Sequence, residues 1–364
     1  MEYELWDMRK FLGMIAQVKP ISTYWRDLMF GYEVTSENEY IDFEKIPANG
    51  RVVAPYVMPL AAGKPVYQQA ARAGRFKPAY VKVKDVIDPL MGLVKVAGSG
   101  EALFNPAKLT ILQRRELIRA SMNSQHVQSI QTLWELQAAQ SAIFAGYEVS
   151  GEDYPAQQIS FGRAANQTIV KTAGTYWGQS GVSILGDIQT WVDRMVDAEF
   201  GALPTRITMG RPVWAIMQKD EEILKHMDVN MKGGAATIER GITTAGPDQN
   251  KAYKVGELKL GGASGAVIEL WVNYDKYQPA RGAAEVHFLP QNMIVMTGSK
   301  EAYMGYGCFG SIIDPKHGYA AVPIAGRNWE ETGDPAVEYM LHQSAPLHVA
   351  LNPNVTLAAQ VIAG

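Results

Sequence analysis

The sequence predicts a mixed α+β protein with more than one domain, and three observations support this prediction. A span of about 40 residues, 106–145, contains no glycine and no proline after Pro106 at its start, and it reads as one long helix. Before it, residues 51–99 read as two strand-like arms rich in proline. After it, helical and strand patterns alternate between residues 181 and 299. Because the chain has 364 residues, two or three domains are expected.

The composition is that of an ordinary globular protein. Hydrophobic residues make up 47% and charged residues 20% of the chain, which is enough to bury a core. The formal net charge of −3 gives no overall basic excess of the kind that marks nucleic-acid readers. Cys308 is the only cysteine, so no intrachain disulfide framework is expected and a reducing compartment is the simplest environment. Neither a signal peptide nor an apolar run of about 18 residues is visible, so the chain is expected to be soluble and cytoplasmic when made.

The two arms at 51–99 show strand character but little to pack against. Residues 80–84, "YVKVK", alternate with period two. Prolines at 55, 59, 65 and 78 exclude the arms from the centre of a sheet. An isolated two-stranded ribbon is marginal in water, so this hairpin is expected to need a neighbour, such as another chain.

The predicted long helix starts after Asn105-Pro106, an N-cap followed by proline, and Gly146 is the expected C-cap. Its apolar stripe is thin and most of its faces are polar. A helix of this kind is normally held by something outside its own fold. Strands around a turn are expected from 147 to 170.

The 181–299 block is expected to hold a helix at 185–200, capped by Asp187 or nearby, and a second helix at 211–227. Its strands are expected at 205–210, 251–261, 266–277 and 285–298. A glycine-rich stretch, 256–267, lies between two of these strands and precedes no helix. We interpret it as a hairpin loop rather than a phosphate site.

No catalytic or metal-binding constellation is recognisable. His342 and His348 lack further ligands at a defined spacing. Ser344 and His342 are two residues apart on a predicted strand, where they lack the geometry that activates a nucleophile. Cys308 has no adjacent cation to lower its thiol pKa, so a packed, inert thiol is expected. Glu330, Glu331 and the Thr332–Pro335 turn read as a solvated loop, with glycine and proline supplying turn geometry.

Charge is asymmetric in one region only. Between Lys64 and Arg119 there are eleven Lys and Arg against four acids, a net of +7. This is either a solvated face or a surface that docks on an acidic neighbour, such as another subunit or DNA phosphates.

Two segments carry a resemblance to a known family. They read "FKPAYVKVKDVIDPLM" and "NWEETGDPAVEYMLHQSAPL", and both resemble the major capsid proteins of the phage lambda type (the major head protein E family). The matching residues are Phe76, Pro78, Tyr80, Val81, Lys82, Lys84, Pro89 and Met91 in the first segment, and Asn328, Trp329, Thr332, Gly333, Asp334, Pro335, Ala336, Glu338 and 343–347 in the second.

The resemblance implies the tailed-phage and herpesvirus capsid fold (Hong Kong 97-like). On this basis we expect an N-terminal arm at 1–50 and an extended loop at 51–100 that reaches over a neighbouring subunit. The peripheral domain would comprise 101–180 and 300–348, with the spine helix at 106–145. The axial domain would comprise 181–299 and 349–364. Inter-subunit contacts are expected from Lys64, Arg72, Arg75, Phe76, Lys77, Tyr80, Lys82 and Lys84, and a structural joint from Trp329, Gly333, Asp334 and Pro335.

The function implied is a head protein of a tailed bacteriophage. Copies would assemble in the host cytoplasm, as hexamers and pentamers, into the icosahedral shell of the virion around double-stranded DNA. No catalytic residue, cofactor, metal or membrane is expected. A scaffold, a portal and a decoration protein would be partners, with the scaffold a separate protein because no long N-terminal domain precedes the loop. Two alternatives remain: a nanocompartment shell protein of the same fold, and an oligomeric α/β enzyme.

Overall fold

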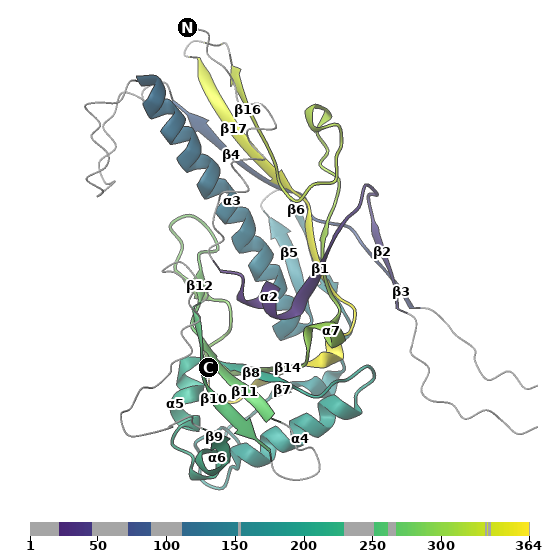
Figure 1. The fold of residues 1–364 in the computed structure, drawn as a ribbon, viewed down its shortest axis with the longest axis vertical. Coiled ribbons are helices and arrows are strands. Elements are labelled where there is room, and N and C mark those ends of the chain that lie inside the picture. The colour runs from purple at the N-terminus through teal and green to yellow at the C-terminus, as the bar shows by residue number, and fades with distance from the viewer. Residues whose placement is uncertain are drawn as a thin grey trace, which may run out of the picture.

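The computed structural model describes residues 22–45, 72–88, 111–151, 154–228, 251–260, 267–331, 333 and 336–363. This part of the chain is elongated (Figure 1). A long helix and a narrow sheet form one end, and a broader sheet with short helices forms the other. None of the described helices combines the length and apolarity needed to cross a membrane. Of the expected N-terminal arm, 1–50, the structure describes residues 22–45.

The broader end is a seven-stranded mixed sheet of order β7-β19-β14-β8-β11-β10-β9. Its core is apolar, and Trp177 stacks on Trp191 with ring centroids 5.7 Å apart. The glycine-rich stretch joins β10 to β11 as an antiparallel hairpin, as expected, although 261–266 lie outside the described residues. The elements are β7 (Thr168–Val170), α4 (Ile184–Asp197), β8 (Arg206–Met209), α5 (Arg211–Met217), α6 (Glu221–His226), β9 (Met227–Asp228), β10 (Ala252–Lys259), β11 (Val267–Asn273), β14 (Met293–Thr297) and β19 (Thr356–Gln360).

Two local expectations in this block were wrong. Helix α4 is capped by Ser183, whose Oγ accepts from the Gly186 amide at 3.0 Å, and not by Asp187. The expected single helix at 211–227 is two helices. Asp220 separates them because its side chain caps the amides at the start of α6, which ends the preceding helix and begins the next.

The long helix α3 (Ile111–Phe144) is unbroken, as predicted, while residues 106–110 lie outside the described ranges. It ends differently from the expectation. Ala145 takes the left-handed conformation with φ 54°, and Gly146 already begins strand β5. A glycine is needed there for another reason: a Cβ at Gly146 would lie 2.4 Å from the carbonyl oxygen of Ile159 on the paired strand.

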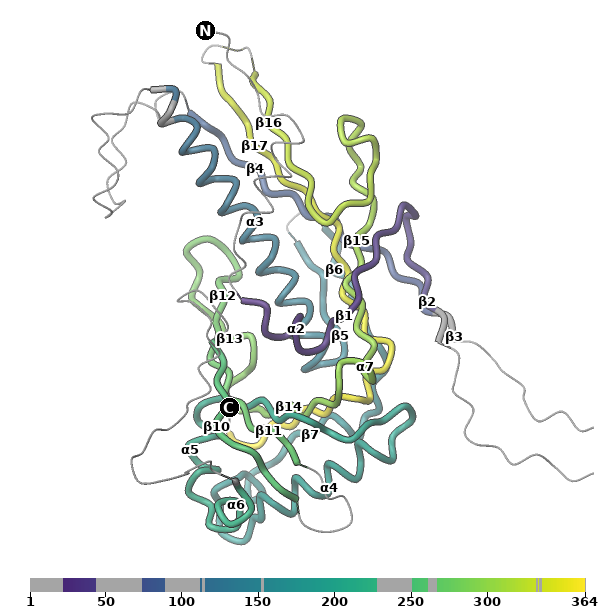
Figure 2. The backbone as a smooth tube through the Cα atoms, in the orientation of Figure 1, coloured from purple at the N-terminus to yellow at the C-terminus, as the bar shows by residue number. Residues whose placement is uncertain are grey.

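Helix α3 lies along a three-stranded sheet of order β16-β17-β4, comprising β4 (Val81–Ile87), β16 (Ala325–Glu331) and β17 (Val337–Ser344). Figure 2 shows these chain segments, far apart in sequence, running side by side with the helix. The neighbour that the second arm was expected to need is therefore found in its own chain. Strand β4 pairs antiparallel with β17 from Val81↔Ser344 to Ile87↔Glu338. It is the edge strand of this sheet, in agreement with the neighbouring prolines.

Smaller elements connect the two ends. Strands β1, β15 and β18 form one sheet; β2 pairs with β3, β5 with β6, and β12 with β13. The β5–β6 pairing confirms the strands expected around the turn near residue 152. The bounds are α2 (Tyr24–Met29), β1 (Phe30–Thr35), β2 (Ile41–Lys45), β3 (Arg72–Phe76), β5 (Gly146–Gly151), β6 (Tyr154–Ser160), η3 (Ala165–Gln167), β12 (Lys276–Tyr277), β13 (Val286–His287), α7 (Lys300–Tyr303), β15 (Gly305–Phe309), η4 (Pro315–His317), β18 (Pro346–Ala350) and η5 (Pro353–Val355).

Candidate functional site

The β2–β3 arm, residues 39–45 and 72–77, carries part of the predicted inter-subunit set. Arg75 Nε lies 3.0 Å from Asp42 Oδ1, and Lys77 Nζ lies 2.8 Å from Glu39 Oε1. Hydrogen bonding to Glu39 raises the pKa of Lys77. All four side chains are exposed, so these ion pairs contribute little stability to the chain itself.

The root of the arm packs on its own chain. Phe76 contacts Phe43 and Phe161, with ring centroids 6.4 and 5.8 Å away, and belongs to the cluster around Ile41. In Figure 1 the arm leaves the body of the molecule sideways at β2 and β3. The structure describes the backbone of Arg72 at the start of β3, while Lys64 lies outside the described residues.

Three other residues of the predicted set lie elsewhere, in the sheet beside α3. The Tyr80 hydroxyl donates to Gln343 Oε1 at 2.8 Å and accepts from the Ile313 amide at 3.0 Å. Lys82 Nζ lies 5.2 Å from the centroid of the Tyr80 ring. Lys84 Nζ lies 3.9 Å from the Tyr339 ring on β17. These contacts are within one chain, so Tyr80, Lys82 and Lys84 are not part of a free-standing hairpin.

The predicted joint is built around an aromatic cross-strand pair. Trp329 on β16 stacks on Tyr339 on β17, with ring centroids 5.3 Å apart and an interplanar angle of 23°. Gly333 lies in a bend between the two strands; Asp334 and Pro335 lie outside the described residues. Ser344 donates to the carbonyl oxygen of Pro323 at 2.6 Å, which is a structural role. On either side of the bend, the segment forms two antiparallel strands of this sheet.

A buried group of polar side chains, which sequence reasoning missed, joins α3 to β17 and β4. We call it the polar seam: Arg115, Arg119, Asn123 and His126 on α3, Glu338 and His342 on β17, and Asp85 on β4. Arg119 Nε lies 2.8 Å from Glu338 Oε1, and the two side chains are 1% and 0% exposed. Arg115 reaches the same carboxylate at 3.2 Å, and Asn328 Nδ2 donates to it at 2.9 Å.

The seam continues through two histidines. His126 Nδ1 lies 3.0 Å from His342 Nδ1, and the other ring nitrogens reach Asp85 Oδ2 at 2.8 Å and Asn123 Oδ1 at 2.9 Å. Burial and the facing ring lower the pKa of His342 to about 3. The expectation that the helix is held from outside its fold was thus incomplete, because its polar face is satisfied inside the chain. A signal existed: positions 115, 119, 123 and 126 fall on one helix face.

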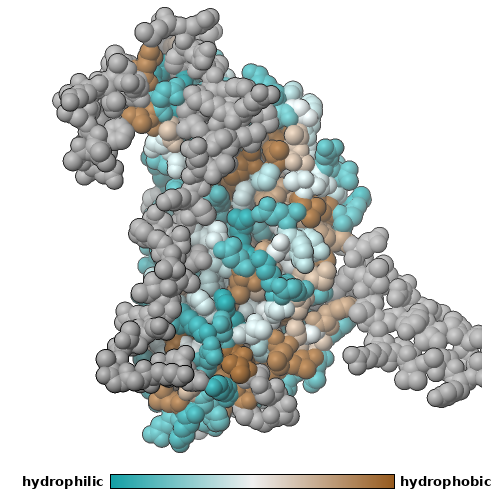
Figure 3. All heavy atoms as spheres, in the orientation of Figure 1, coloured by the Kyte–Doolittle hydropathy of each residue, from teal (hydrophilic) through white to brown (hydrophobic). Residues whose placement is uncertain are grey.

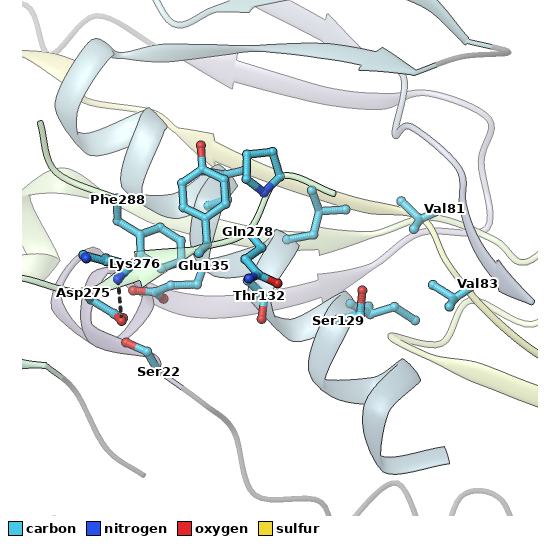
Figure 4. A pocket seen from close by; sticks show the side chains of 15 residues that line it. Ser22, Val81, Val83, Ser129, Thr132, Glu135, Asp275, Lys276, Gln278 and Phe288 are labelled. Atoms are coloured by element: carbon cyan, nitrogen blue, oxygen red, sulfur yellow. Dashed lines mark hydrogen bonds between the residues drawn. The ribbon is translucent and has the colours of Figure 1, made fainter. Parts of the chain in front are cut away.

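A pocket of about 430 Å³ lies between α3, β4 and the loop after β11. Figure 4 shows Glu135, Asp275 and Ser22 close together at one end of it. The Glu135 carboxylate accepts the Trp25 and Arg26 amides at 2.6 and 3.2 Å, so it anchors α2 to α3. Burial raises the pKa of Glu135 to about 8. Within the described ranges, no three His, Cys, Asp or Glu residues are grouped so that they could hold a metal ion.

His348 and Cys308, for which no catalytic or metal-binding role was expected, are buried. His348 Nδ1 contacts Gln137 Oε1 at 3.0 Å, and burial lowers the pKa of His348 to about 3. Cys308 is free and inaccessible, and burial raises its pKa to about 12, which agrees with the expected inert thiol. Both side chains are thus held in the interior by packing, and His348 also by a hydrogen-bonding contact.

The outer surface in the view of Figure 3 is a mixture of hydrophilic and hydrophobic patches. Large apolar side chains are exposed on several elements of the described chain, including Ile313 at 72% and Tyr319 at 55%. Single exposed apolar side chains are normal on protein surfaces and do not by themselves mark an interface.

Fold and site together define a structural protein with the capsid fold of tailed phages, in which a projecting arm, a long helix along a sheet and a compact α/β body are combined. The same fold is seen in a crystal structure assigned to the capsid protein of a prophage of Escherichia coli CFT073. That structure matches with a TM-score of 0.70 and 19% identity, covering 99% of this chain and 100% of the other. The expected fold class is confirmed.

The chain belongs to the family of phage major capsid protein E, whose profile matches residues 7–361. It is 25% identical to the major capsid protein of Escherichia phage lambda over 338 residues, 91% of each chain. It is 24% identical to the major capsid protein of Enterobacteria phage P21 over 361 residues, 98% of this chain and 99% of the relative. The chain is thus a major capsid protein of the virion shell. The family match favours this function over the two alternatives, a nanocompartment shell protein and an oligomeric enzyme.

Proposed function

We propose that the chain is the head protein of a tailed bacteriophage, assembling as hexamers and pentamers into an icosahedral shell around double-stranded DNA. The observation that carries the proposal is the family match, which spans residues 7–361 and therefore both ends of the described fold. The role is structural. The buried polar groups hold α3 against the sheet and are engaged in hydrogen bonds, so the proposal includes no catalytic step and no cofactor.

Contact with the packaged DNA is proposed to be independent of base sequence. The formal net charge of −3 provides no strong general attraction for phosphates. A shell that confines DNA needs closure and strength rather than affinity. A scaffold, a portal and a decoration protein are proposed as further partners, on the strength of the family resemblance.

The β2–β3 arm is proposed as one contact between subunits. A two-stranded ribbon is marginal by itself, and among the described residues of this one the packing on its own chain is made by Ile41, Phe43 and Phe76 at its root. Arg75 and Lys77, on either side of Phe76 in the chain, remain exposed with the acids that face them. A neighbouring subunit that covers the arm would supply the packing surface that the chain itself does not.

Electron microscopy of the purified protein tests the shell. Closed particles are expected, whereas discrete small oligomers would contradict the proposal. Nuclease treatment of particles from infected cells should leave protected double-stranded DNA. Particles empty of DNA and loaded with a protein cargo would instead indicate a nanocompartment.

A charge reversal tests the arm. Arg75→Glu with Lys77→Glu should leave the circular dichroism of the chain unchanged, because both side chains lie outside the core. It should lower the yield of shells in sedimentation, most at low salt where screening is weakest. Lys219→Glu, an exposed reversal beside α5, is the control. Wild-type assembly of the double variant at low salt would show that these charges face solvent in the shell.

A further inference from the structure

We infer that the His126–His342 pair of the polar seam holds one proton more than two neutral imidazoles, so that it forms a cationic clamp between α3 and the sheet, balanced by Asp85. This goes beyond the shell function and does not depend on it. It rests on the positions of four side chains that form one chain of hydrogen bonds across three elements.

The charge of the pair follows from the number of hydrogens that its contacts need. The row of hydrogen bonds runs from Asn123 Oδ1 through His342 and His126 to Asp85 Oδ2, with three contacts of 2.9, 3.0 and 2.8 Å. Both ends are oxygens that accept. Each contact needs one hydrogen, so three hydrogens must come from the two rings. Two neutral imidazoles carry only two between them, and the third hydrogen makes the pair a cation.

The position of the extra charge follows from the surroundings. His342 is 0% exposed and its Nε2–H donates to the Asn123 amide oxygen, so its Nδ1 is left to accept. His126 then donates from both ring nitrogens, to His342 and to Asp85. The Asp85 side chain is 49% exposed, so its negative charge remains solvated while it balances the imidazolium.

The other charged groups around the pair compensate one another. On α3, one turn before Asn123, Arg119 and Arg115 both contact Glu338 of β17, and Arg119 also contacts Glu116 at 2.6 Å. These two cations and two anions sum to zero. From β4 the acid that faces the rings is Asp85, and on β16 the residue opposite His342 is Gly326, which carries no charge. The arginines therefore do not expel the proton.

The clamp has a mechanical consequence. With the third hydrogen present, β4, α3 and β17 are joined by an unbroken set of charge-assisted bonds. When it is lost, either one of the three contacts breaks, because two acceptors then face each other, or the Asn123 amide turns to donate in place of accepting. The contact between the long helix and the edge strand should therefore be tighter below the pH at which this proton leaves than above it.

Nitrogen NMR of shells or chains labelled with ¹⁵N-histidine tests the inference directly. At pH 7.5, about one unit above the usual histidine pKa, three of the four ring nitrogens of the pair should be protonated. The signals are assigned by their loss in His126→Gln and in His342→Gln. Two protonated nitrogens of four would overturn the inference, since the Asn123 amide would then be turned to donate.

A second measurement does not depend on the histidine variants folding. Asp85→Asn removes the balancing charge at a half-exposed position, and it should release the extra proton, leaving two protonated ring nitrogens at pH 7.5. Asp42→Asn on the β2–β3 arm removes an equally exposed charge far from the seam and should leave three. An unchanged count in Asp85→Asn would show that Asp85 does not balance a charge on the rings.

Discussion

Arg119 on α3 and Glu338 on β17 form an ion pair that is removed from solvent on both sides, with 1% and 0% of the side chains exposed. The pair joins the first third of the long helix to a strand more than 200 residues later. Its effect on the free energy of unfolding differs from that of the exposed ion pairs on the β2–β3 arm. Removing one member of a buried pair leaves the other charge without compensation in a medium that solvates it poorly.

Glu338→Gln keeps the shape of the side chain and removes its charge. We expect the free energy of unfolding to fall by about 3–5 kcal/mol, measured by denaturant titration of the unassembled chain. Asp42→Asn breaks the exposed contact with Arg75 and should cost at most about 1 kcal/mol. Equal losses for the two variants would contradict the assignment of the seam as the main polar attachment of α3.

Glu135 predicts a pH dependence. Burial raises its pKa from 4.5 to about 8, so between these values the folded chain holds a proton that the unfolded chain releases. The free energy of unfolding therefore falls as pH rises through this window, by at most about 1.4 kcal/mol per pH unit from this group. Glu135→Gln cannot titrate, and it keeps an oxygen to accept the Trp25 amide.

Between pH 5 and 8, the free energy of unfolding of Glu135→Gln should therefore depend less on pH than that of the wild type. Denaturant titrations at several pH values measure this. Glu33→Gln, at an exposed side chain near Arg26, controls for the loss of one negative charge. Parallel profiles for the wild type and Glu135→Gln would mean that Glu135 is ionised in the folded chain at neutral pH.

Cys308 should be unreactive in the folded protein. It is fully buried in β15, and the thiolate, which is the reactive form, is suppressed because burial raises the pKa to about 12. Mass spectrometry after maleimide treatment should find no adduct on native protein and full modification in guanidinium. Rapid labelling of native shells would show that β15 opens.

Strand β15 offers a matched pair of glycines. A Cβ at Gly305 would lie 2.4 Å from the carbonyl oxygen of Met29, where β1 leaves α2, whereas a Cβ at Gly307 meets nothing nearer than 3.6 Å. Gly305→Ala should lower the thermal midpoint, with a cost on the order of 1–3 kcal/mol from forced displacement of the backbone. Gly307→Ala should have a clearly smaller effect. The reverse order in calorimetry would contradict the close approach of β1 and β15.

Several features of the fold were predictable because their signals are local. The absence of glycine and proline after Pro106 predicted the long helix, and the alternation of apolar and charged residues predicted β4. Other local signals compete within a few residues, which is why Ser183 rather than Asp187 caps α4 and Ala145 rather than Gly146 ends α3. Differences of this size depend on a single hydrogen bond, and sequence pattern does not rank them.

The sequence by itself determined the family, through two ordered segments at residues 76–91 and 328–347, and with it the fold and the structural role. Only the tertiary structure decided which side chains the polar residues of α3 contact. Their partners, the buried Glu338 and His342 and the half-exposed Asp85, come from strands whose pairing spans more than 250 residues. A charged residue looks the same in sequence whether it faces water or a partner, because its burial depends on the strand that packs against it.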